Sequence, residues 1–462
     1  MNRYIGIDLG TSSVKVLLIN ENEIEKAVSR DYPVYYPAPN YSEQNPIDWY
    51  KQTISALDEL LADIDKSTVK AMSFSGQMHG LVMLDKNDNI IRPAILWNDG
   101  RSTKEVDFLN NEIGTDFLLK HTGNIAFAGF TAPKLLWVKN NEPENFSRIS
   151  KIMLPKDYLA YRLSGVFATD VSDASGTLYF DVDNRKWSKE MFDILEINEG
   201  MLPTVYESNE IIGKWNGIDI VIGGGDNACS AVGMGVVNDG ECNISLGTSG
   251  TIFVETDNHN YAKNGAIHAF CSASGKYHYL ACILSAASCQ KWWIEDILKA
   301  DYNTDDMEQY LDKNDVIFMP YLMGERSPIN NPNAKAMLYG MTPATTREQM
   351  SLAVLEGVAL ALKQNIEIIR SLGVTINKAK ICGGGARNKL WCKIIANALN
   401  VTLEIPELEQ GGALGAALLA MNDNEKAKSF YKVKKVINPD IELTEYYNLK
   451  YQKFIQLQGN II

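Results

Sequence analysis

The sequence predicts an α/β protein with two similar domains and a ligand cleft between them, and two observations carry this prediction. The chain has 462 residues, which is more than one hydrophobic core usually organises. A pattern of strand, Gly-Thr-Ser turn and strand also occurs twice, around Gly10 and again around Gly247, roughly half a chain apart. We therefore expect domains at residues 1–237 and 238–462, with one hairpin turn from each facing the cleft.

The composition is that of an ordinary globular protein, with 45% hydrophobic and 22% charged residues. A net charge of −13 and the lack of a Lys/Arg block argue against a nucleic-acid partner. No apolar run reaches the length of a membrane span, and the chain opens on a strand rather than a signal peptide. The seven cysteines form no CxxC pair. We expect a cytoplasmic enzyme with no membrane partner.

The first strand, Tyr4 to Leu9, leads through Gly10-Thr11-Ser12-Ser13 into a second strand, Val14 to Ile19. Small residues and hydroxyls in such a turn direct several N–H and O–H donors at one point, which suits a phosphate. An ordinary hairpin turn remains the alternative. Asp8 interrupts an otherwise apolar strand beside this turn, where a carboxylate could hold a hydrated Mg²⁺ ion.

The next elements are a helix and two strands with polar ends. Asn45-Pro46 predicts a helix start, and the spacing of six apolar residues predicts its buried face: Ile47, Tyr50, Ile54, Leu57, Leu61 and Ile64. A strand from Val69 to Phe74 ends in Ser75-Gly76-Gln77-Met78-His79-Gly80, and a strand from Ala94 to Trp97 ends in Asn98-Asp99-Gly100-Arg101. Both ends suit a polyhydroxylated ligand, although His79 could equally be a structural histidine.

An apolar strand from Ile218 to Ile222 ends in three glycines and Asp226. The glycines allow a sharp turn and the close approach of a ligand. Asp226 stands where a helix begins, so it is either a helix N-cap or a functional carboxylate. The second hairpin follows, with strands Glu241 to Leu246 and Thr251 to Glu255 around Gly247-Thr248-Ser249-Gly250, and with Ser245 in the place of Asp8.

The second half predicts alternating helices and strands. Thr346 and Gln349 form a capping box at the start of a long helix that ends near Gly373. A strand from Lys380 to Cys382 leads into Gly383-Gly384-Gly385-Ala386-Arg387-Asn388 and a helix to about Leu399. A strand from Val401 to Ile405 and a small-residue helix from Gly411 follow, and we expect a helical tail from Asn422 onwards.

Three chemistries use glycine-rich turns of this kind. A Walker P-loop is absent, because no G-x-x-x-x-G-K-[ST] occurs. A dinucleotide fingerprint is incomplete, because Asn388 stands where the third glycine of Gly383-x-Gly385 should be, so a dehydrogenase is disfavoured. Paired hairpin turns for the β- and γ-phosphates, with the Gly383–Asn388 turn for adenosine, fit better.

This ordered set of motifs resembles the FGGY family of carbohydrate kinases, within the sugar kinase, Hsp70 and actin superfamily, and the resemblance covers nearly the whole chain. It implies two actin-like, ribonuclease-H-like domains. The matching segments are the two phosphate hairpins, the adenosine turn, the connecting segments Gly223–Asn227 and Gly411–Ala417, and the family signatures Thr131–Val138 and Leu338–Glu356. Gln77–Gly80, Leu96–Arg101 and Pro155–Leu159 resemble the bacterial members that phosphorylate D-xylulose. Glycerol-specific members carry an Arg–Glu pair where this chain has Met78-His79.

The resemblance implies transfer of the γ-phosphoryl group of Mg-ATP to the 5-hydroxyl of D-xylulose, in pentose catabolism. It implies that Asp226 accepts the proton of the sugar hydroxyl and that Asp8 holds Mg²⁺ largely through water. The remaining expected contacts are Met78, His79, Asn98, Asp99 and Asp226 for the sugar, Gly10, Thr11, Ser12, Gly247 and Thr248 for the phosphates, and Gly384, Gly385 and Asn388 for the nucleotide.

Three other functions share part of this pattern. A chaperone-type or actin-type ATP clamp shares the fold but lacks a hydroxyl pocket and a base. A sugar-sensing repressor would carry a helix-turn-helix before the first strand, where only three residues precede Tyr4. Another FGGY kinase, acting on a different ketose or polyol, is the nearest alternative. The sequence does not show the oligomeric state, although members of this family are often homodimers.

Overall fold

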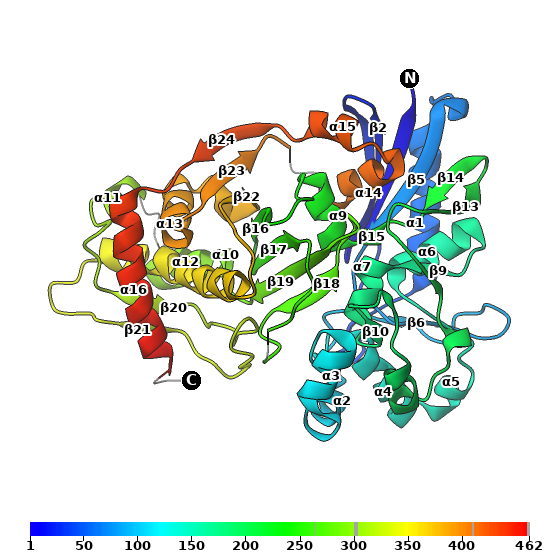
Figure 1. The fold of residues 1–462 in the computed structure, drawn as a ribbon, viewed down its shortest axis with the longest axis horizontal. Helices are drawn as coiled ribbons and strands as arrows, with labels where there is room; N and C mark the ends of the chain where they lie inside the picture. Colours follow the sequence, from blue (N-terminus) through cyan, green and yellow to red (C-terminus); the bar gives the residue numbers. More distant parts are fainter. Residues whose placement is uncertain (263, 300–303, 409–410, 460–462) are drawn as a thin grey trace.

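The computed structural model describes residues 1–262, 264–299, 304–408 and 411–459. Two α/β domains lie side by side, with the first domain on the right and the second on the left of Figure 1. The second domain carries the C-terminal helix α16 (Ile441–Gly459) on its outer side.

Each domain is built on a seven-stranded mixed sheet. The first sheet has the order β13 (Ile211–Trp215), β14 (Ile218–Val221), β5 (Val69–Gly76), β1 (Arg3–Leu9), β2 (Ser13–Asn20) and β3 (Ile24–Asp31), with β15 (Gly224–Gly225) also paired to β5. The second has the order β18 (His268–Cys271), β19 (Tyr277–Ile283), β17 (Gly250–Thr256), β16 (Cys242–Leu246), β22 (Lys378–Cys382), β23 (Thr402–Pro406) and β24 (Val433–Ile437).

The two sheets repeat one plan, which confirms the duplicated architecture. In the first, β1 pairs antiparallel with β2 and parallel with β5, and β2 pairs antiparallel with β3. In the second, β16 pairs antiparallel with β17 and parallel with β22, and β17 pairs antiparallel with β19. Each phosphate-type turn therefore joins the central strand of a sheet to its antiparallel neighbour.

Helices cover the sheets. The larger ones are α1 (Pro46–Leu61), α4 (Thr131–Asn141), α6 (Pro155–Ser164), α9 (Asp226–Gly233), α12 (Arg347–Ser371), α13 (Lys389–Leu399) and α14 (Gly411–Met421). The capping box of Thr346 and Gln349 is formed at the start of α12, and the Asn45 side chain caps α1 as expected.

Shorter helices and strands connect the main elements of each domain. In the first domain these are β4 (Glu43–Gln44), β6 (Val82–Leu84), β7 (Ala94–Ile95), α2 (Thr103–Asp107), α3 (Thr115–Thr122), α5 (Pro143–Ser147), β8 (Lys151–Met153), β9 (Ala168–Asp170), α7 (Val171–Ala174), β10 (Phe180–Asp181), β11 (Lys186–Trp187), α8 (Phe192–Leu195) and β12 (Thr204–Tyr206). In the second they are α10 (Ala287–Trp292), α11 (Thr304–Glu308), β20 (Ile317–Met319), β21 (Met337–Tyr339) and α15 (Asn424–Ala427).

Three local expectations were wrong. The tail after Asn422 is not only helical, because β24 extends the second sheet by pairing with β23. The expected buried face of α1 was wrong at Ile47, which is exposed. Leu57 and Leu61 are buried as expected, together with Trp49, Thr53, Ala56 and Leu60, since the sheet meets the helix on the face that carries Trp49. The strand expected from Ala94 to Trp97 is paired only over Ala94–Ile95, because β4 has only two residues to pair with it.

Helix α14 joins the domains. It follows β23 of the second domain, yet packs on β1 and β5 of the first domain and on α9, as its place beside the blue strands in Figure 1 shows. A Cβ atom on Gly6 or Gly415 would collide with backbone atoms across these contacts, so close approach requires glycine. The small-residue composition of α14 therefore sets the distance between this helix and the phosphate strand β1.

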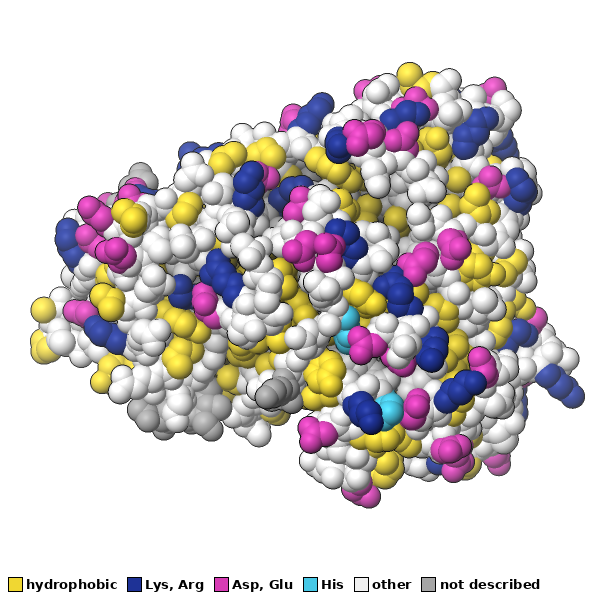
Figure 2. All heavy atoms as spheres, in the orientation of Figure 1, with side chains coloured by type: hydrophobic (Ala, Val, Ile, Leu, Met, Phe, Trp, Pro, Cys, Tyr) yellow, Lys and Arg dark blue, Asp and Glu magenta, His cyan; other side chains and the backbone are white. Residues whose placement is uncertain are grey.

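The surface carries both signs of charge. Figure 2 shows Lys and Arg side chains interspersed with Asp and Glu side chains over the displayed face. Among the described residues, no helix has the length and apolar content needed to cross a bilayer.

Candidate active site

A cavity of about 190 Å³ lies between the two domains. The first domain contributes Met78, His79 and Asp226, three of the residues that the sequence predicted to bind a sugar. The other residues that line the cavity are Trp97, Phe127, Gly129, Phe130, Asn227, Ser249, Thr251, His268, Phe270, Leu280, Cys282 and Arg326. Apolar walls with a few convergent polar groups are typical of small-molecule sites.

Asp226 occupies the first turn of α9, and Gly225 rather than Asp226 is the N-cap residue. Its Oδ1 accepts hydrogen bonds from the backbone N–H (2.7 Å) and side-chain amide (2.9 Å) of Asn227. Burial, followed by the negative charge of Asp8, raises the pKa of Asp226 to about 7. A carboxylate with this pKa can take up a proton near neutral pH, as a general base must.

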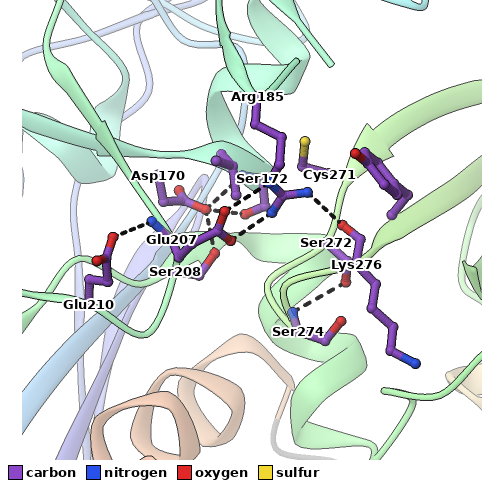
Figure 3. Close-up of polar contacts among 12 residues, drawn as sticks. Asp170, Ser172, Arg185, Glu207, Ser208, Glu210, Cys271, Ser272, Ser274 and Lys276 are labelled. Carbon is purple, nitrogen blue, oxygen red and sulfur yellow. Dashed lines mark hydrogen bonds and ion pairs between the residues drawn. The ribbon is translucent and has the colours of Figure 1, made fainter. Parts of the chain in front are cut away.

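A buried polar network fixes the turn that carries Asp226. The Gly225 N–H donates to Ser172 Oγ at 3.1 Å, and Ser172 Oγ donates to Asp170 at 2.5 Å. Figure 3 shows Ser172 and Ser208 converging on the Asp170 carboxylate, and Lys156 pairs with the same group at 2.8 Å. The peptide before Asp226 is thus held by a chain of side chains that ends in a buried ion pair.

Asp8 lies at the end of β1, next to the first hairpin turn. Its Oδ1 accepts a 2.8 Å hydrogen bond from Ser75 Oγ at the end of the neighbouring strand β5. Burial raises the pKa of Asp8, and the Ser75 hydrogen bond and the nearby Lys15 oppose that increase. Gly412 of α14 closes over this pair, since a Cβ there would lie 2.8 Å from Asp8 Oδ1.

The donor set around Asp8 fits a hard cation that keeps most of its water. Mg²⁺ is commonly held by one or two carboxylates together with substrate phosphates. Asp8 and Asp226 are close enough for their charges to interact. Within the described ranges, no group of three or more His, Cys, Asp and Glu side chains is placed to hold a metal.

One ring nitrogen of His79 forms a hydrogen bond within the protein. Its Nδ1 lies 2.7 Å from the carbonyl oxygen of Gly176, so Nδ1 carries the proton and Nε2 is an acceptor. Burial, followed by the charge of Lys134, lowers the pKa of His79 to about 3. The buried Lys134 also donates to the His79 carbonyl at 2.9 Å. His79 is therefore a neutral side chain held in place from two sides.

The other two residues expected at the sugar site lie elsewhere. Asn98 is exposed, and Asp99 is buried in an ion pair with Arg101, whose Nε lies 2.9 Å from Asp99 Oδ1. The Ser42 N–H also donates to Asp99. Among the described residues that line the cavity, neither Asn98 nor Asp99 is found. Their contact with a sugar remains a prediction.

The two hairpin turns have different surroundings. In the first, the Trp97 indole N–H donates to Thr11 Oγ1 at 3.0 Å, and Tyr32 donates to the carbonyl of Gly10. In the second, the carbonyls of Gly247 and Thr248 accept N–H groups from the start of α10. Ser12 is exposed. In these bonds the turns use carbonyl and hydroxyl acceptors. The Gly10 N–H donates to the Ser13 carbonyl at 3.0 Å, so an anion would have to be bound by other N–H groups of the turns.

A second, wider groove of about 920 Å³ lies beside β22 and α13. Gly384 and Asn388 line it, together with the cations Arg387, Lys389 and Lys393. Gly385 is buried under the turn, where a Cβ would lie 2.8 Å from the Trp391 ring. Asn388 caps α13 by accepting the Trp391 N–H at 3.1 Å.

Several lining residues were not found from the sequence. Phe127, His268 and Arg326 come from segments without a glycine-rich turn or a strand-end polar cluster, so no local signal marked them. They are brought together by the packing of the two domains.

Comparisons with known proteins show which family the chain resembles. Residues 3–233 match the family model described as "FGGY family of carbohydrate kinases, N-terminal domain", and residues 242–422 match that of the C-terminal domain. The chain is 39% identical to the xylulose kinase of Escherichia coli (strain K12) over 451 residues, covering 93% of this chain and 92% of that protein. It is 36% identical to the xylulose kinase of Bacillus subtilis (strain 168), covering 91% and 88%.

Solved structures of other proteins share the two-domain fold of this chain. A xyloylose kinase from Brucella ovis aligns with a TM-score of 0.93 at 37% identity, covering 99% of each chain. A glycerol kinase from Plasmodium falciparum aligns with a TM-score of 0.91 at 23% identity, covering 99% of this chain and 98% of that chain. The second match shows that the architecture is shared, since its identity is low.

Proposed function

Because the chain belongs to the FGGY family of carbohydrate kinases, we propose that it transfers the γ-phosphoryl group of ATP to the 5-hydroxyl of D-xylulose, giving D-xylulose 5-phosphate. The single observation that carries this proposal is the cavity in which Asp226, with a pKa near 7, shares one wall with Met78 and His79. Relatives named xylulose kinases at 36–39% identity support the choice of sugar.

In the proposed reaction, the sugar hydroxyl attacks the γ-phosphorus while Asp226 accepts its proton. The P–O bond to the β-phosphate breaks, and ADP leaves with that electron pair. Phosphoryl transfer needs positioning and charge neutralisation more than covalent chemistry from the protein. The Ser172–Asp170 network keeps the base in place, so little rearrangement is needed when the sugar binds.

The phosphates would be held between the two hairpin turns. Gly10, Thr11 and Ser12 would approach them from the first domain, and Gly247 and Thr248 from the second. Because the turns belong to different domains, both can hold one triphosphate only when the domains are close together. Such closure would also exclude water, which could otherwise accept the phosphoryl group in place of the sugar.

We assign Asp8 to the magnesium ion, mostly through bound water. When bound, Mg²⁺ neutralises negative charge on the phosphates. Ser75 and Gly412 orient the Asp8 carboxylate for this role.

The nucleotide would occupy the wide groove. Gly384 and Asn388 would face the adenosine, while the buried Gly385 allows the turn to pack on Trp391. The lysines and Arg387 along the groove would favour an anionic ligand.

Met78 and the neutral His79 would bind the sugar, with His79 Nε2 accepting a hydroxyl hydrogen. A neutral imidazole suits an uncharged polyhydroxylated ligand better than an imidazolium, which would favour an anion. We also propose a cytoplasmic location, supported by the absence of a disulfide among the described cysteines. The oligomeric state, with a homodimer as the family precedent, is left to measurement.

A coupled ADP-release assay over D-xylulose, L-ribulose, xylitol and glycerol tests the proposal. We expect kcat/KM for D-xylulose to exceed that for L-ribulose and glycerol by at least ~10²-fold, because a wrong sugar leaves buried polar groups unpaired. Equal or better turnover of glycerol would overturn the choice of D-xylulose and leave the family assignment intact.

A further inference from the structure

Arg326 is a cation that lines the sugar cavity, and no carboxylate of the described residues forms an ion pair with it. It lines the cavity together with Asp226 and His79, and it is only partly exposed. Its guanidinium lies over the Phe127 ring of the first domain, 5.5 Å from the ring centroid. Across the described part of the chain, this guanidinium forms no ion pair within 4 Å and no side-chain hydrogen bond, although Arg carries five N–H donors.

Against the larger effect of burial, the charge of Arg326 acts to lower the pKa of the neighbouring Glu325, but the two side chains form no ion pair. Glu325 is buried, and its Oε1 accepts the backbone N–H groups of Leu284 and Arg326, both at 2.8 Å. Burial raises the pKa of Glu325 to about 7, so its charge is reduced near neutral pH. The two histidines nearby, His79 and His268, are both held neutral by burial, with the positive charge of Arg326 contributing.

The backbone on both sides of Arg326 is fixed. The N–H of Glu325 donates to the carbonyl of Asn331 at 2.9 Å, and the N–H of Ser327 donates to the carbonyl of Cys282 at 3.0 Å. Asn365 of α12 donates to the carbonyl of Ser327. The guanidinium is therefore presented to the cavity from a rigid segment, which reduces the entropy lost when a ligand binds.

The backbone of residues 326–327 lies across β19 from the second phosphate hairpin. Cys282 of β19 pairs with Thr251 of β17, close to the second turn. The carbonyl of Cys282 accepts the N–H of Ser327, so residues 326–327 lie across β19 from Thr251, in line with β18. Two strand spacings of about 4.8 Å separate these backbones. The guanidinium lies over Phe127, whose ring contacts Phe130 and His268, so Arg326 belongs to the aromatic wall of the cavity that also carries His79.

We propose that Arg326 is the sugar-binding residue of the second domain, donating hydrogen bonds to oxygen atoms at the end of the sugar remote from the reacting hydroxyl. This inference rests on the proposed function. It explains how the site would distinguish sugars by the length of their carbon chain. A five-carbon sugar with its reacting hydroxyl at Asp226 reaches toward Arg326, whereas a three-carbon polyol does not. Because Arg326 belongs to one domain and Asp226 to the other, the same contact favours domain closure on a full-length sugar.

The test compares Arg326→Met and Arg326→Lys with Arg347→Met, a matched change at an exposed arginine of the same domain. Charge-assisted hydrogen bonds of this kind are worth about 10- to 100-fold in affinity. We expect Arg326→Met to raise both KM and the calorimetric Kd for D-xylulose by that factor, and Arg326→Lys by less. The affinity for a non-hydrolysable ATP analogue should change less than about twofold, and Arg347→Met should match the wild type.

Two results would overturn the inference. One is unchanged D-xylulose affinity in a folded Arg326→Met protein. The other is a loss of nucleotide affinity as large as the loss of sugar affinity, which would place Arg326 at the phosphates. If the wild type phosphorylates another sugar of the panel and not D-xylulose, the proposed substrate is wrong but the role of Arg326 is still tested. The same variants are then measured with the sugar that is accepted.

Discussion

Ser75 and Asp8 end two neighbouring parallel strands, and the Ser75 hydroxyl donates a 2.8 Å hydrogen bond to the Asp8 carboxylate. Gly412 of α14 lies directly over this pair. A helix that follows the last parallel strand of the second domain therefore sets the position of a carboxylate in the first. The proposed metal ligand and the packing of α14 on the first sheet are coupled through one glycine.

This coupling predicts the effect of Gly412→Ala. The added methyl group would collide with Ser75 Oγ, and overpacking of this kind typically costs about 1–3 kcal/mol. We expect a lower melting temperature, and a lower kcat at low Mg²⁺ that improves as Mg²⁺ is raised, because Asp8 is displaced. Gly459→Ala is the control, since nothing lies within 4 Å of a Cβ there. Unchanged stability and Mg²⁺ response would contradict the coupling.

A second prediction concerns Asp226→Asn. Asparagine keeps the size of the side chain but cannot accept the proton, so kcat should fall by about 10²- to 10⁴-fold or more. Nucleotide affinity should barely change, and sugar affinity should change modestly. Melting temperature and kcat are measured on the same preparation. A folded variant with nearly full activity removes Asp226 as the base.

The pKa of Asp226 also predicts two pH dependences. In the wild type, kcat/KM should rise with pH around 7, because the protonated carboxyl cannot act as a base. A carboxyl whose folded pKa is raised stabilises the fold when protonated, and this stability is lost as pH rises from about 4 to 7. Asp226→Asn should therefore gain melting temperature relative to the wild type as pH rises through this range. A difference that does not vary with pH would argue against the raised pKa.

Asp8→Asn should fail in a different way. Its loss of kcat should be partly relieved by raising Mg²⁺, whereas that of Asp226→Asn should not, because only Asp8 is assigned to the metal. The negative charge of Asp8 contributes to the raised pKa of Asp226, so the midpoint of the kcat/KM–pH profile should move to lower pH in Asp8→Asn. Steady-state assays at several Mg²⁺ concentrations and pH values check both points. An unmoved midpoint would show that the two carboxylates are electrostatically independent.

Two substitutions separate the structural role of His79 Nδ1 from the proposed sugar-binding role of its Nε2. Asn can replace the Nδ1 donor to Gly176, and it tolerates the positive φ of 67° at this position. His79→Asn should keep its melting temperature but raise the KM for sugar by about 10- to 100-fold, because the Nε2 acceptor is lost. His79→Gln should lose stability, by about 1–3 kcal/mol, because the Gly176 carbonyl is left unpaired. If His79→Asn binds sugar normally, His79 is structural only.

The sequence by itself determined the repeated hairpins, the three-glycine turn before Asp226 and the capping box of Thr346 and Gln349, because each is fixed by residues close together in the chain. Asp8, Met78, His79 and Asp226 could be found in this way, since each stands at the end of an apolar strand or beside glycines. Only the tertiary structure decided the rest. Asp99 lies in an ion pair with Arg101, and β24 extends the second sheet, because partners distant in sequence were available to them. Arg326 and Asp226 meet in one cavity only because the two domains pack against each other, and no local pattern encodes a contact between surfaces that far apart in the chain.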